Sequence, residues 1–375
     1  MVIYLVSFLI SFSIVKTIER WSTVSVGFWV WSTVALIIPC LVAGMRAETI
    51  GTDVSVYVKP LYDLAENSTS FSGYYSSYWW NVFRYTGPGD YEIGFSLLVW
   101  LSSVIGSDFS FALFAIQALT IVPIYFALIR LRKSDSISIS AGLLIYYLLY
   151  FNVSLNLMRQ WIAMAFLLLA ITYLLDRKKI QYFILSAIAF LFHDSAIIAS
   201  LVIFGLWIYV CKRDGGYAYR VLIAALISSL FIIFGLKLVA SILLLVGFSG
   251  YVQYIGTGEV DLVVSQLLLL TPGVLLVLLF WNKCCQAKPK MYFFLLVMVI
   301  GVVVSQLGSI TDQSSRLAQY FSYLMILAFP LLGSIISSNR KRVLFFTLCF
   351  SYCLTYWIVV YVITGANQTV PYMFG

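Results

Sequence analysis

Charged residues are scarce in this sequence. Asp, Glu, Lys and Arg make up 10% of its 375 residues, whereas 62% are hydrophobic. Soluble domains usually carry about 25% charged residues. Because no stretch is hydrophilic enough to form a separate soluble domain, we interpret residues 1–375 as a single membrane domain.

Metal-binding and nucleotide-binding motifs are also missing. The sequence has no HExxH, DxD, P-loop or paired-cysteine pattern and only one histidine. Asp53, Glu92, Asp194 and Asp312 are oxygen donors, but their spacing does not require a metal. We therefore expect neither a metal nor another cofactor.

The six cysteines show no metal-ligand spacing, and three of them neighbour basic clusters, which indicates cytoplasmic thiols and not a disulfide framework. They are Cys40, Cys211, Cys284, Cys285, Cys349 and Cys353. The net charge of +8 does not indicate nucleic-acid binding, because the charges lie in short clusters between apolar runs, as orientation in a bilayer requires.

Long apolar runs are abundant. A membrane-spanning helix needs about 20 mostly apolar residues, and we predict an all-α polytopic membrane protein with about twelve transmembrane helices. The expected spans lie near 2–15, 24–44, 109–129, 138–156, 160–175, 180–192, 195–210, 221–247, 263–282, 291–309, 317–336 and 343–364.

A thirteenth apolar stretch, residues 92–106, decides the topology. If it lies on the membrane surface, most of the 23 basic residues fall on one side, and the positive-inside rule makes that side cytoplasmic. If it crosses, this asymmetry largely collapses. We therefore predict an interfacial helix at 92–106 and both termini on the outer side, together with six basic residues: Arg46, Lys59, Arg84, Arg159, Lys237 and Arg316.

This topology gives one long outer loop, residues 46–108. Its segment 71–85 is rich in Tyr, Trp and Phe. Aromatic rings suit sugar rings and also the headgroup zone of a membrane, so both a sugar-binding surface and a plain interfacial belt remain open.

Two turns on the outer side are predicted to lie below the membrane surface. The run 180–192 is short for a span, since thirteen residues rise about 20 Å and the hydrocarbon core is about 30 Å thick. Non-helical backbone at such depth needs protein or a water-filled cavity around it. The turn at His193–Ser195 and the stretch Asn152–Gln160 therefore indicate a cavity open to the outer side.

Three outer arginines lie at span ends: Arg46, Arg159 and Arg316. A guanidinium is a permanent cation whose planar donors match phosphate oxygens, so three converging arginines would suit a diphosphate. The alternative for any one of them is a side chain that reaches the interface and pairs with a carboxylate.

Three outer residues are candidate proton acceptors. Asp53 follows a Gly-Thr turn and suits a general base, a sugar-hydroxyl acceptor or a helix N-cap. Glu92 opens the interfacial helix and favours its N-terminus. His193, the only histidine, suits acceptance of a proton from a hydroxyl near neutral pH, although a lone histidine is often only structural. We rank His193 and Asp53 above Glu92.

These residues together resemble the EpsG family of Wzy-type polysaccharide polymerases, which make O-antigen, capsule or exopolysaccharide. The resemblance covers most of the chain in the same order. It rests on five segments: Gly51-Thr52-Asp53 with Tyr57, Glu92-x-Gly94-Phe95, Leu157-Met158-Arg159-Gln160-Trp161-Ile162-Ala163, Phe192-His193-Asp194-Ser195-Ala196 and Ser315-Arg316-Leu317-Ala318-Gln319-Tyr320-Phe321.

The resemblance implies a glycosyltransferase with a GT-C-like fold in the bacterial cytoplasmic membrane, with its active site facing the periplasm. A growing glycan on undecaprenyl diphosphate would be transferred to a lipid-linked repeat unit, releasing undecaprenyl diphosphate. Partners would be these lipid-linked donor and acceptor glycans, membrane lipid, a chain-length regulator and a flippase.

On this hypothesis the diphosphate would contact Arg159 and Arg316, with Arg46 as a third candidate, and Gln160 would also bind substrate. The base would be His193, Asp53 or Glu92, and sugars would contact Tyr57, Tyr320 and the aromatic segment. Three other classes remain open: a flippase or other transporter of lipid-linked oligosaccharide, a membrane O-acyltransferase, and a ligase that moves finished polymer. A transporter should show internal repeats, and an acyltransferase gives the arginines no role.

Overall fold

The computed structural model describes residues 1–81, 84–106, 108–211, 264–280, 289–306 and 312–375, together with positions 223 and 227. These residues are mostly helical, in agreement with the predicted all-α class. They divide into two compact units: unit 1 comprises Met1–Ser200 and Cys353–Gly375, and unit 2 comprises Leu201–Tyr352.

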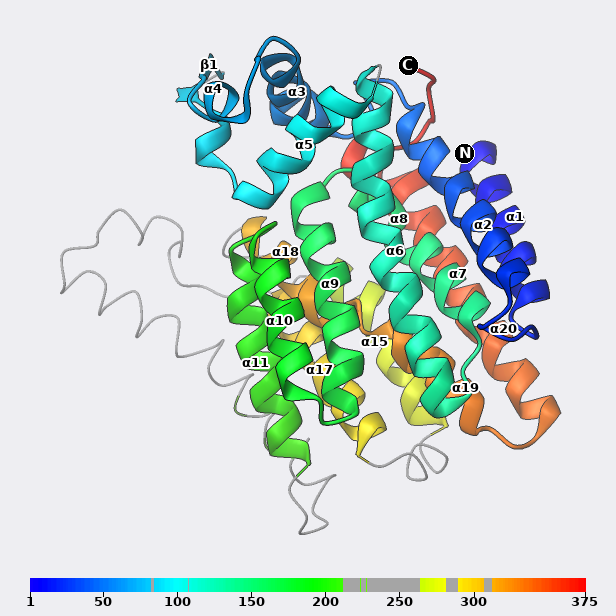
Figure 1. The fold of residues 1–375 in the computed structure, drawn as a ribbon. Coiled ribbons are helices and arrows are strands. Elements are labelled where there is room, and N and C mark those ends of the chain that lie inside the picture. The colour runs from blue at the N-terminus through cyan, green and yellow to red at the C-terminus, as the bar shows by residue number, and fades with distance from the viewer. Residues whose placement is uncertain are drawn as a thin grey trace. The chain divides into compact units, whose positions relative to one another are not determined.

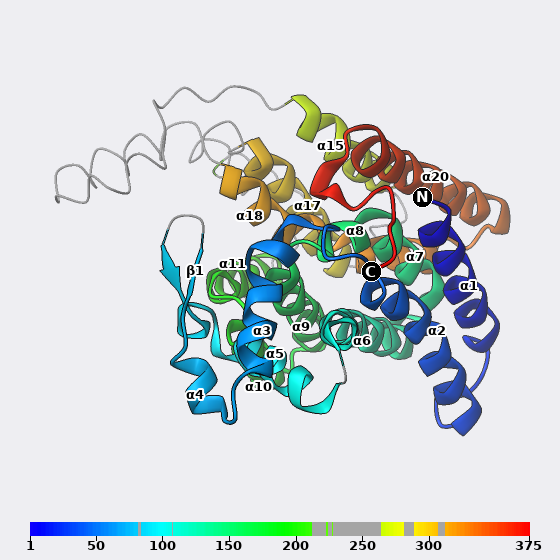
Figure 2. The ribbon, with the colours of Figure 1, turned by 90° about the horizontal axis from the view of Figure 1, so that it is seen from above.

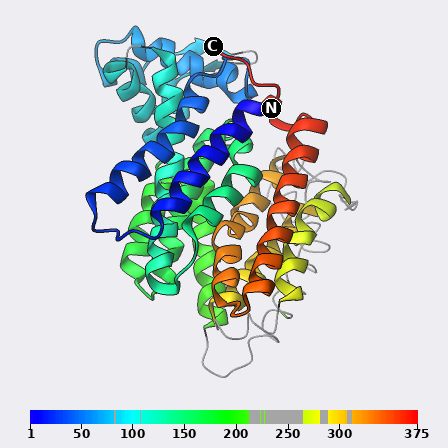
Figure 3. The same ribbon diagram turned by 90° about the vertical axis from the view of Figure 1, so that its right-hand side faces the viewer.

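Long helices form the body of unit 1 (Figure 1). Helix α6 packs on both α2 and α9, α9 packs on α10, and α1 pairs with α2, as Figure 3 shows. The helices are α1 (Val2–Ile18), α2 (Val26–Gly44), α6 (Phe109–Asp135), α7 (Ile139–Leu149), α9 (Met158–Leu175), α10 (Lys179–Phe190) and the start of α11 (Ser195–Val210).

Local sequence signals set the limits of α6. Asp108 is its N-cap, and the Asp108 carboxylate accepts a hydrogen bond from the Phe111 N–H at 3.1 Å, which satisfies one of the four free N–H groups of the first turn. The helix ends at Ser136, which adopts a left-handed conformation with φ 56°. Its 27 residues span about 40 Å and separate two polar clusters described below.

The connection between α7 and α9 is broken and buried, as predicted for Asn152–Gln160. Residues 150–158 are all buried, and only a short helix, α8 (Phe151–Ser154), interrupts the turn. Asn152 Nδ2 donates to Thr369 Oγ1 at 3.0 Å, and Asn152 Oδ1 accepts from Trp357 Nε1 at 2.8 Å. Both polar atoms of the Asn152 side-chain amide thus have hydrogen-bond partners within the protein, as is usual for a buried amide.

The loop 46–108 folds into short elements at one end of unit 1. They are η1 (Val54–Val58), α3 (Lys59–Glu66), α4 (Phe71–Tyr75), a hairpin of β1 (Trp79–Trp80) and β2 (Tyr85–Thr86), η2 (Pro88–Asp90) and α5 (Ile93–Ile105). The strands pair antiparallel, with Trp79 opposite Thr86 and Trp80 opposite Tyr85. Figures 1 and 2 show this group above α9 and α10.

A buried cluster joins the loop elements to the long helices. Tyr57, Leu61 and Phe95 of the loop are each at most 5% exposed and pack with Leu113 of α6 and Ile162 of α9. Burial of aromatic and aliphatic side chains contributes about 1.5–3 kcal/mol each. The loop is therefore a packed layer and holds its polar residues in fixed positions.

Helix α5 corresponds to the predicted interfacial helix at 92–106. It has 13 residues, which rise about 20 Å, and it packs on α3 and α6. Its exposed residues are apolar: Ile93, Leu97, Leu101, Val104 and Ile105. The helix is thus short for a span and apolar on its free side, while its position at a membrane surface stays a prediction.

The C-terminal segment, Gly365–Gly375, packs against the beginning of the loop. Ala47 N donates to the Met373 carbonyl at 2.9 Å, and Gly375 N donates to the Met45 carbonyl at 3.0 Å. Asn156 Nδ2 donates to Asn367 Oδ1 at 3.3 Å. The segment is thereby joined to both the loop and the buried turn before α9.

Unit 2 is helical as well. Its described helices are α15 (Val264–Leu279), α17 (Lys290–Ser305), α18 (Asp312–Ser322), α19 (Met325–Ile335) and most of α20 (Asn339–Trp357), which continues in unit 1 into η6 (Ile358–Ile363) and η7 (Ala366–Gln368). The expected span 221–247, apart from positions 223 and 227, and the pair Cys284 and Cys285 lie outside the described residues. Cys40 and Cys353 are buried free thiols.

Within the described part of the chain, five helical segments are long and apolar enough to cross a membrane: Val26–Gly44, Phe109–Asp135, Met158–Leu175, Arg316–Ile335 and Asn339–Ile363. Seven shorter apolar helices accompany them. A helical membrane protein is therefore supported, whereas the number of twelve spans, the single domain and the GT-C-like fold stay predictions.

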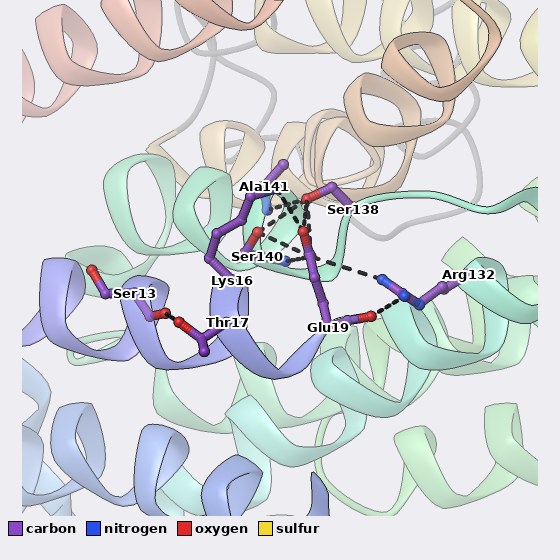
Figure 4. Close-up of polar contacts among 8 residues, drawn as sticks. All are labelled: Ser13, Lys16, Thr17, Glu19, Arg132, Ser138, Ser140 and Ala141. Carbon is purple, nitrogen blue, oxygen red and sulfur yellow. Dashed lines mark hydrogen bonds and ion pairs between the residues drawn. The ribbon is translucent and has the colours of Figure 1, made fainter. Parts of the chain in front are cut away.

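A buried carboxylate lies at the far end of α6 from the loop (Figure 4). Glu19, 6% exposed, accepts hydrogen bonds from Ser138 Oγ at 3.1 Å, Ser140 N at 3.2 Å and Ser140 Oγ at 3.1 Å. Lys16 Nζ lies 2.6 Å from its other oxygen, and Arg132 binds its carbonyl. This one side chain joins α1, α6 and the N-terminus of α7.

We expect Glu19→Gln to destabilise unit 1 by about 2 kcal/mol, because hydrogen bonds to a charged group contribute about 1.5–3 kcal/mol and the amide removes that charge. Thermal unfolding of the protein in lipid nanodiscs measures the effect. Glu66→Gln, an exposed glutamate at the end of α3, is the control. An equal midpoint for both variants would contradict this role of Glu19.

Candidate functional site

Three distant chain segments meet at the carboxylate of Glu92. Glu92 occupies the N-cap position of α5, yet its side chain makes no capping hydrogen bond. It instead reaches Arg159, the second residue of α9, and His193 in the turn between α10 and α11. We call Glu92, Arg159 and His193 the Glu92 cluster.

Each oxygen of Glu92 serves a different partner. Oε2 forms an ion pair with Arg159 Nη1. Oε1 accepts from His193 Nδ1 at 2.7 Å and from the Asp194 N–H at 3.3 Å. The Glu92 side chain is 8% exposed, whereas those of Arg159 and His193 are 24% and 26% exposed. The carboxylate is therefore enclosed and both of its partners reach the surface.

A close backbone contact fixes this geometry. The Gly94 N–H donates to the Leu191 carbonyl at 2.9 Å, and a Cβ atom on Gly94 would lie 2.6 Å from that oxygen. Only glycine allows the start of α5 to lie against the turn that carries His193. Phe192 in the same turn stacks on Phe166 of α9, with ring centroids 5.9 Å apart.

The cluster keeps Glu92 ionised. Burial raises the pKa of the Glu92 carboxyl, but the hydrogen bond from His193 and the charge and hydrogen bond of Arg159 outweigh burial and hold the pKa at about 2. At neutral pH Glu92 is thus an acceptor for its two partners and a weak base.

Aromatic rings surround the guanidinium of Arg159. Its Cζ atom lies 5.0 Å from the Tyr57 ring centroid and 4.9 Å from that of Tyr91. These two rings stack with centroids 5.2 Å apart, and Trp79 stacks on Tyr91 at 6.1 Å. Arg159 Nε is buried with no hydrogen-bond partner in the described residues. The cation is thus held by rings and retains unused donor capacity.

Asp53 lies beside this arrangement through Tyr57. The Tyr57 hydroxyl donates to Asp53 Oδ2 at 3.0 Å, and Asn156 Oδ1 accepts from the Asp53 N–H at 3.0 Å and from Thr52 Oγ1 at 3.1 Å. Gly51, with φ 86°, allows the turn that brings these groups to Asn156. Asp53 is the N-cap of η1 by position, but its side chain makes no capping bond.

Arg46 lies in a different environment from that expected of a diphosphate ligand. It is 3% exposed, and its Nη1 and Nη2 donate to the carbonyls of Ala43 at 2.7 Å and Leu155 at 3.1 Å. Burial lowers the pKa of its guanidinium to about 10, so it remains a cation at neutral pH. Its bonds tie α2 to the buried turn before α9, and its assignment to the diphosphate stays a prediction.

The remaining predicted site residues are Gln160 in unit 1 and Arg316 and Tyr320 in unit 2. Gln160 is buried within α9, and its amide lies 3.7 Å from Met164 Sδ. Arg316 is exposed and Tyr320 is 1% exposed, and both belong to α18 in unit 2. Their assignment to the same site as Arg159 stays a prediction. Among the described residues, no group of three or more His, Cys, Asp or Glu could hold a metal ion.

Sequence reasoning missed several residues of this region. Tyr91 lies against the Arg159 guanidinium, Asn156 holds the Asp53 turn, and Gly94 permits the approach of α5. Tyr91 and Gly94 lie within two positions of Glu92, so their place in the sequence could have indicated them. Asn156 had no such indication, because its partner Asp53 is about a hundred positions away.

The arrangement can bind an anion and accept a proton at neighbouring points. Arg159 offers a permanent cation. The carboxylate of Glu92 fixes the His193 ring with Nδ1 as donor, which leaves Nε2 as the acceptor in the neutral ring. A hydroxyl placed at Nε2 would donate its proton to His193, and an anionic leaving group would bind Arg159.

Comparison with known proteins gives one family. The model of the EpsG family matches residues 29–374, which includes every residue of the Glu92 cluster. The comparisons with curated proteins and with solved structures each give no match.

We expect Gly94→Ala to separate Glu92 from His193, because the new methyl group would overlap the Leu191 carbonyl. Overpacking of this kind costs about 1–3 kcal/mol. Thermal unfolding in nanodiscs tests this. Gly205→Ala in α11 is the matched control, since nothing lies within 4 Å of a Cβ there. If both variants are equally stable, α5 can move away from the Leu191 carbonyl without lowering the stability of the fold.

The depressed pKa of Glu92 predicts a pH dependence. A carboxyl group whose pKa is lower in the folded state stabilises the fold above its usual pKa of about 4.5, and this contribution is lost as the pH falls toward 2. The difference in unfolding midpoint between wild type and Glu92→Gln should shrink as the pH falls from 4.5 toward 2. A difference that does not change with pH would contradict the ion pair.

Proposed function

The chain belongs to the EpsG family, and on that premise we propose that it is a polysaccharide polymerase. Membership points to polysaccharide polymerisation at the level of the family. The finer proposal is a glycosyltransferase of the GT-C type that joins repeat units carried on undecaprenyl diphosphate.

One observation carries this proposal: Glu92 brings Arg159 and His193 to the same carboxylate, although the three residues lie far apart in the sequence. Transfer of a sugar from a lipid diphosphate needs a cation at the leaving group and a proton acceptor at the attacking hydroxyl. The Glu92 cluster supplies one group of each kind in a partly enclosed position.

The leaving group gains negative charge as its bond to the sugar breaks. A preorganised cation in a site of low dielectric stabilises such charge strongly. Arg159 is held by its ion pair with Glu92 and by the rings of Tyr57 and Tyr91, so its charge is in place before the donor arrives. In this proposal Arg159 binds the diphosphate, and Arg316 remains a second candidate.

The attacking hydroxyl must lose its proton. His193 is the proposed base, because Glu92 orients its ring and its side chain is partly exposed. Asp53 is the second candidate, since it lies one hydrogen bond from Tyr57 and therefore beside Arg159. Glu92 is the weakest candidate, because both of its oxygens are bound and its pKa is about 2.

Sugars would contact the aromatic residues next to Arg159. Trp79 and Tyr91 stack in parallel, with 6° between their planes, and flat rings of this kind suit the apolar face of a sugar. Trp80 and Tyr85, 62% and 70% exposed, extend this surface along the hairpin. Longer glycan chains would reach them.

The proposed location is the bacterial cytoplasmic membrane, with the Glu92 cluster on the periplasmic face. The positive-inside rule supports this side, because the clusters of basic residues fall opposite to the loop 46–108. The lipid-linked donor and acceptor would enter from the bilayer. The chain-length regulator and the flippase expected from the family resemblance are proposed protein partners.

Reconstitution with a lipid-linked repeat unit tests the function. The substrate is isolated from a strain that lacks this protein and is added to the purified protein in liposomes. A ladder of products means a polymerase, a single transfer means a ligase, and an unchanged glycan that crosses the bilayer means a transporter. Transfer of an acyl group would mean an O-acyltransferase. Only the ladder agrees with our proposal.

We expect Arg159→Ala and Arg159→Lys each to reduce polymer formation about 100-fold or more, because removal of one charge-stabilising donor costs about 10²–10³ in rate and lysine cannot reproduce a planar, stacked guanidinium. Lys178→Ala, an exposed cation after the other end of α9, is the control. Wild-type polymer from either Arg159 variant would exclude Arg159 from the reaction.

A further inference from the structure

Glu92 is shared between the two groups that the proposed reaction needs. Its Oε2 atom is bound to Arg159 and its Oε1 atom to His193 and the Asp194 N–H. The carboxylate is 8% exposed, so water replaces neither partner easily. A change in the ion pair of Arg159 therefore alters the hydrogen bond of His193, because both residues bind the Glu92 carboxylate.

An anionic donor would compete with Glu92 for Arg159. Glu92 occupies Nη1 of the guanidinium, and the diphosphate carries more negative charge than a carboxylate. Two anions on one cation in a partly buried site repel each other, because the dielectric there is lower than in water. Diphosphate binding is thus expected to draw the guanidinium away from the carboxylate, at least in part.

From this geometry we propose that Glu92 is a positioning residue that releases Arg159 to the donor diphosphate and then binds His193 alone, so that donor binding prepares the histidine to accept the proton. The inference rests on the proposed function and extends it. It assigns an order to the reaction, with the donor bound before the acceptor hydroxyl is activated.

The bond changes balance without any further reactant. The acceptor hydroxyl oxygen forms a bond to C1 of the donor sugar, and the bond from C1 to the diphosphate oxygen breaks. That oxygen leaves with the electron pair and is stabilised by Arg159. The hydroxyl proton passes to Nε2 of His193, while the Nδ1 proton stays on the hydrogen bond to Glu92.

The release of the Glu92 carboxylate from Arg159 matters most when the proton moves to His193. Proton transfer turns His193 into an imidazolium, and an ionised carboxylate at Nδ1 stabilises this cation. While Arg159 also binds Glu92, part of the negative charge is already neutralised. Full stabilisation of the imidazolium is therefore available only when the diphosphate has taken over Arg159.

Binding of inorganic diphosphate to the purified protein in nanodiscs tests the proposal without any turnover. In Glu92→Gln the competing charge is gone and the residue keeps its size, so we expect diphosphate to bind about tenfold more tightly. If Glu92 only held Arg159 in place, the variant would bind diphosphate more weakly. Unchanged or weaker binding would overturn the proposal.

Kinetics with the lipid-linked repeat unit give the second measurement. Glu92→Gln should lower the KM for the donor and lower kcat at least tenfold, because the donor site is released and the histidine loses its carboxylate. An unchanged kcat would overturn the proposal. Glu66→Gln, exposed on the same loop, should leave both constants unchanged.

The wild-type protein allows a test that needs no variant. His193 is the only histidine, so a protein with a histidine-free affinity tag and ¹⁵N-labelled histidine gives one set of imidazole signals. Diphosphate should move the Nδ1–H proton signal downfield, as a stronger hydrogen bond to Glu92 requires. A signal that does not respond to diphosphate would count against the coupling.

Failure of this inference and failure of the proposed function give different results. If the wild type makes a ladder but Glu92→Gln binds diphosphate more weakly, the enzyme is a polymerase and Glu92 is only a scaffold for Arg159. If the wild type makes no ladder from the lipid-linked unit, the function itself is wrong.

Discussion

The ionised carboxylate of Glu92 is the interaction on which the described site depends. It joins the loop 46–108, helix α9 and the turn between α10 and α11 through an ion pair with Arg159 and a hydrogen bond from His193. Enclosure of this carboxylate would be costly without partners. The cation of Arg159 and the Nδ1–H of His193 offset that cost, and each is oriented in return. Stability and the proposed chemistry thus rest on the same three groups.

The packing around the carboxylate explains how a long loop can hold such a geometry. Tyr57 and Phe95 bury the loop against α6 and α9, and Gly94 lets the start of α5 touch the Leu191 carbonyl. The Glu19 cluster fixes the opposite ends of α1, α6 and α7. Two buried acids therefore hold unit 1 together: Glu92 joins α5, α9 and the α10–α11 turn, and Glu19 joins α1, α6 and α7.

The sequence predicted the class of fold and part of the site. Apolar runs between charge clusters indicate helices because a helix satisfies its own backbone in lipid, and the submerged stretch before α9 followed from Asn152 and Asn156 in apolar surroundings. The scarcity of polar residues made Arg159, His193 and Glu92 visible as candidates. Their pairing could not be predicted, since it depends on how α5 lies on the α10–α11 turn, which a short apolar segment does not specify.

The contacts of Arg46 could not be predicted from its position in the sequence. A span-end arginine has the same sequence signature whether it faces a ligand or the backbone, and only packing distinguishes the two. The carbonyls of Ala43 and Leu155 bind Arg46, which is buried. The Arg159 side chain, in contrast, is 24% exposed. Residue type indicated charge, whereas the neighbours of each guanidinium could be found only from the structure.

The docked C-terminal segment has a consequence for biogenesis. Met373 and Gly375 form backbone hydrogen bonds beside Arg46, and Asn367 binds Asn156, which in turn holds the Asp53 turn. The contacts of the C-terminal segment join residues that are at least 211 positions apart in the sequence. Membrane insertion proceeds from the N-terminus, so the loop and the turn before α9 are made first, and this face of unit 1 closes only once residues 365–375 have been synthesised.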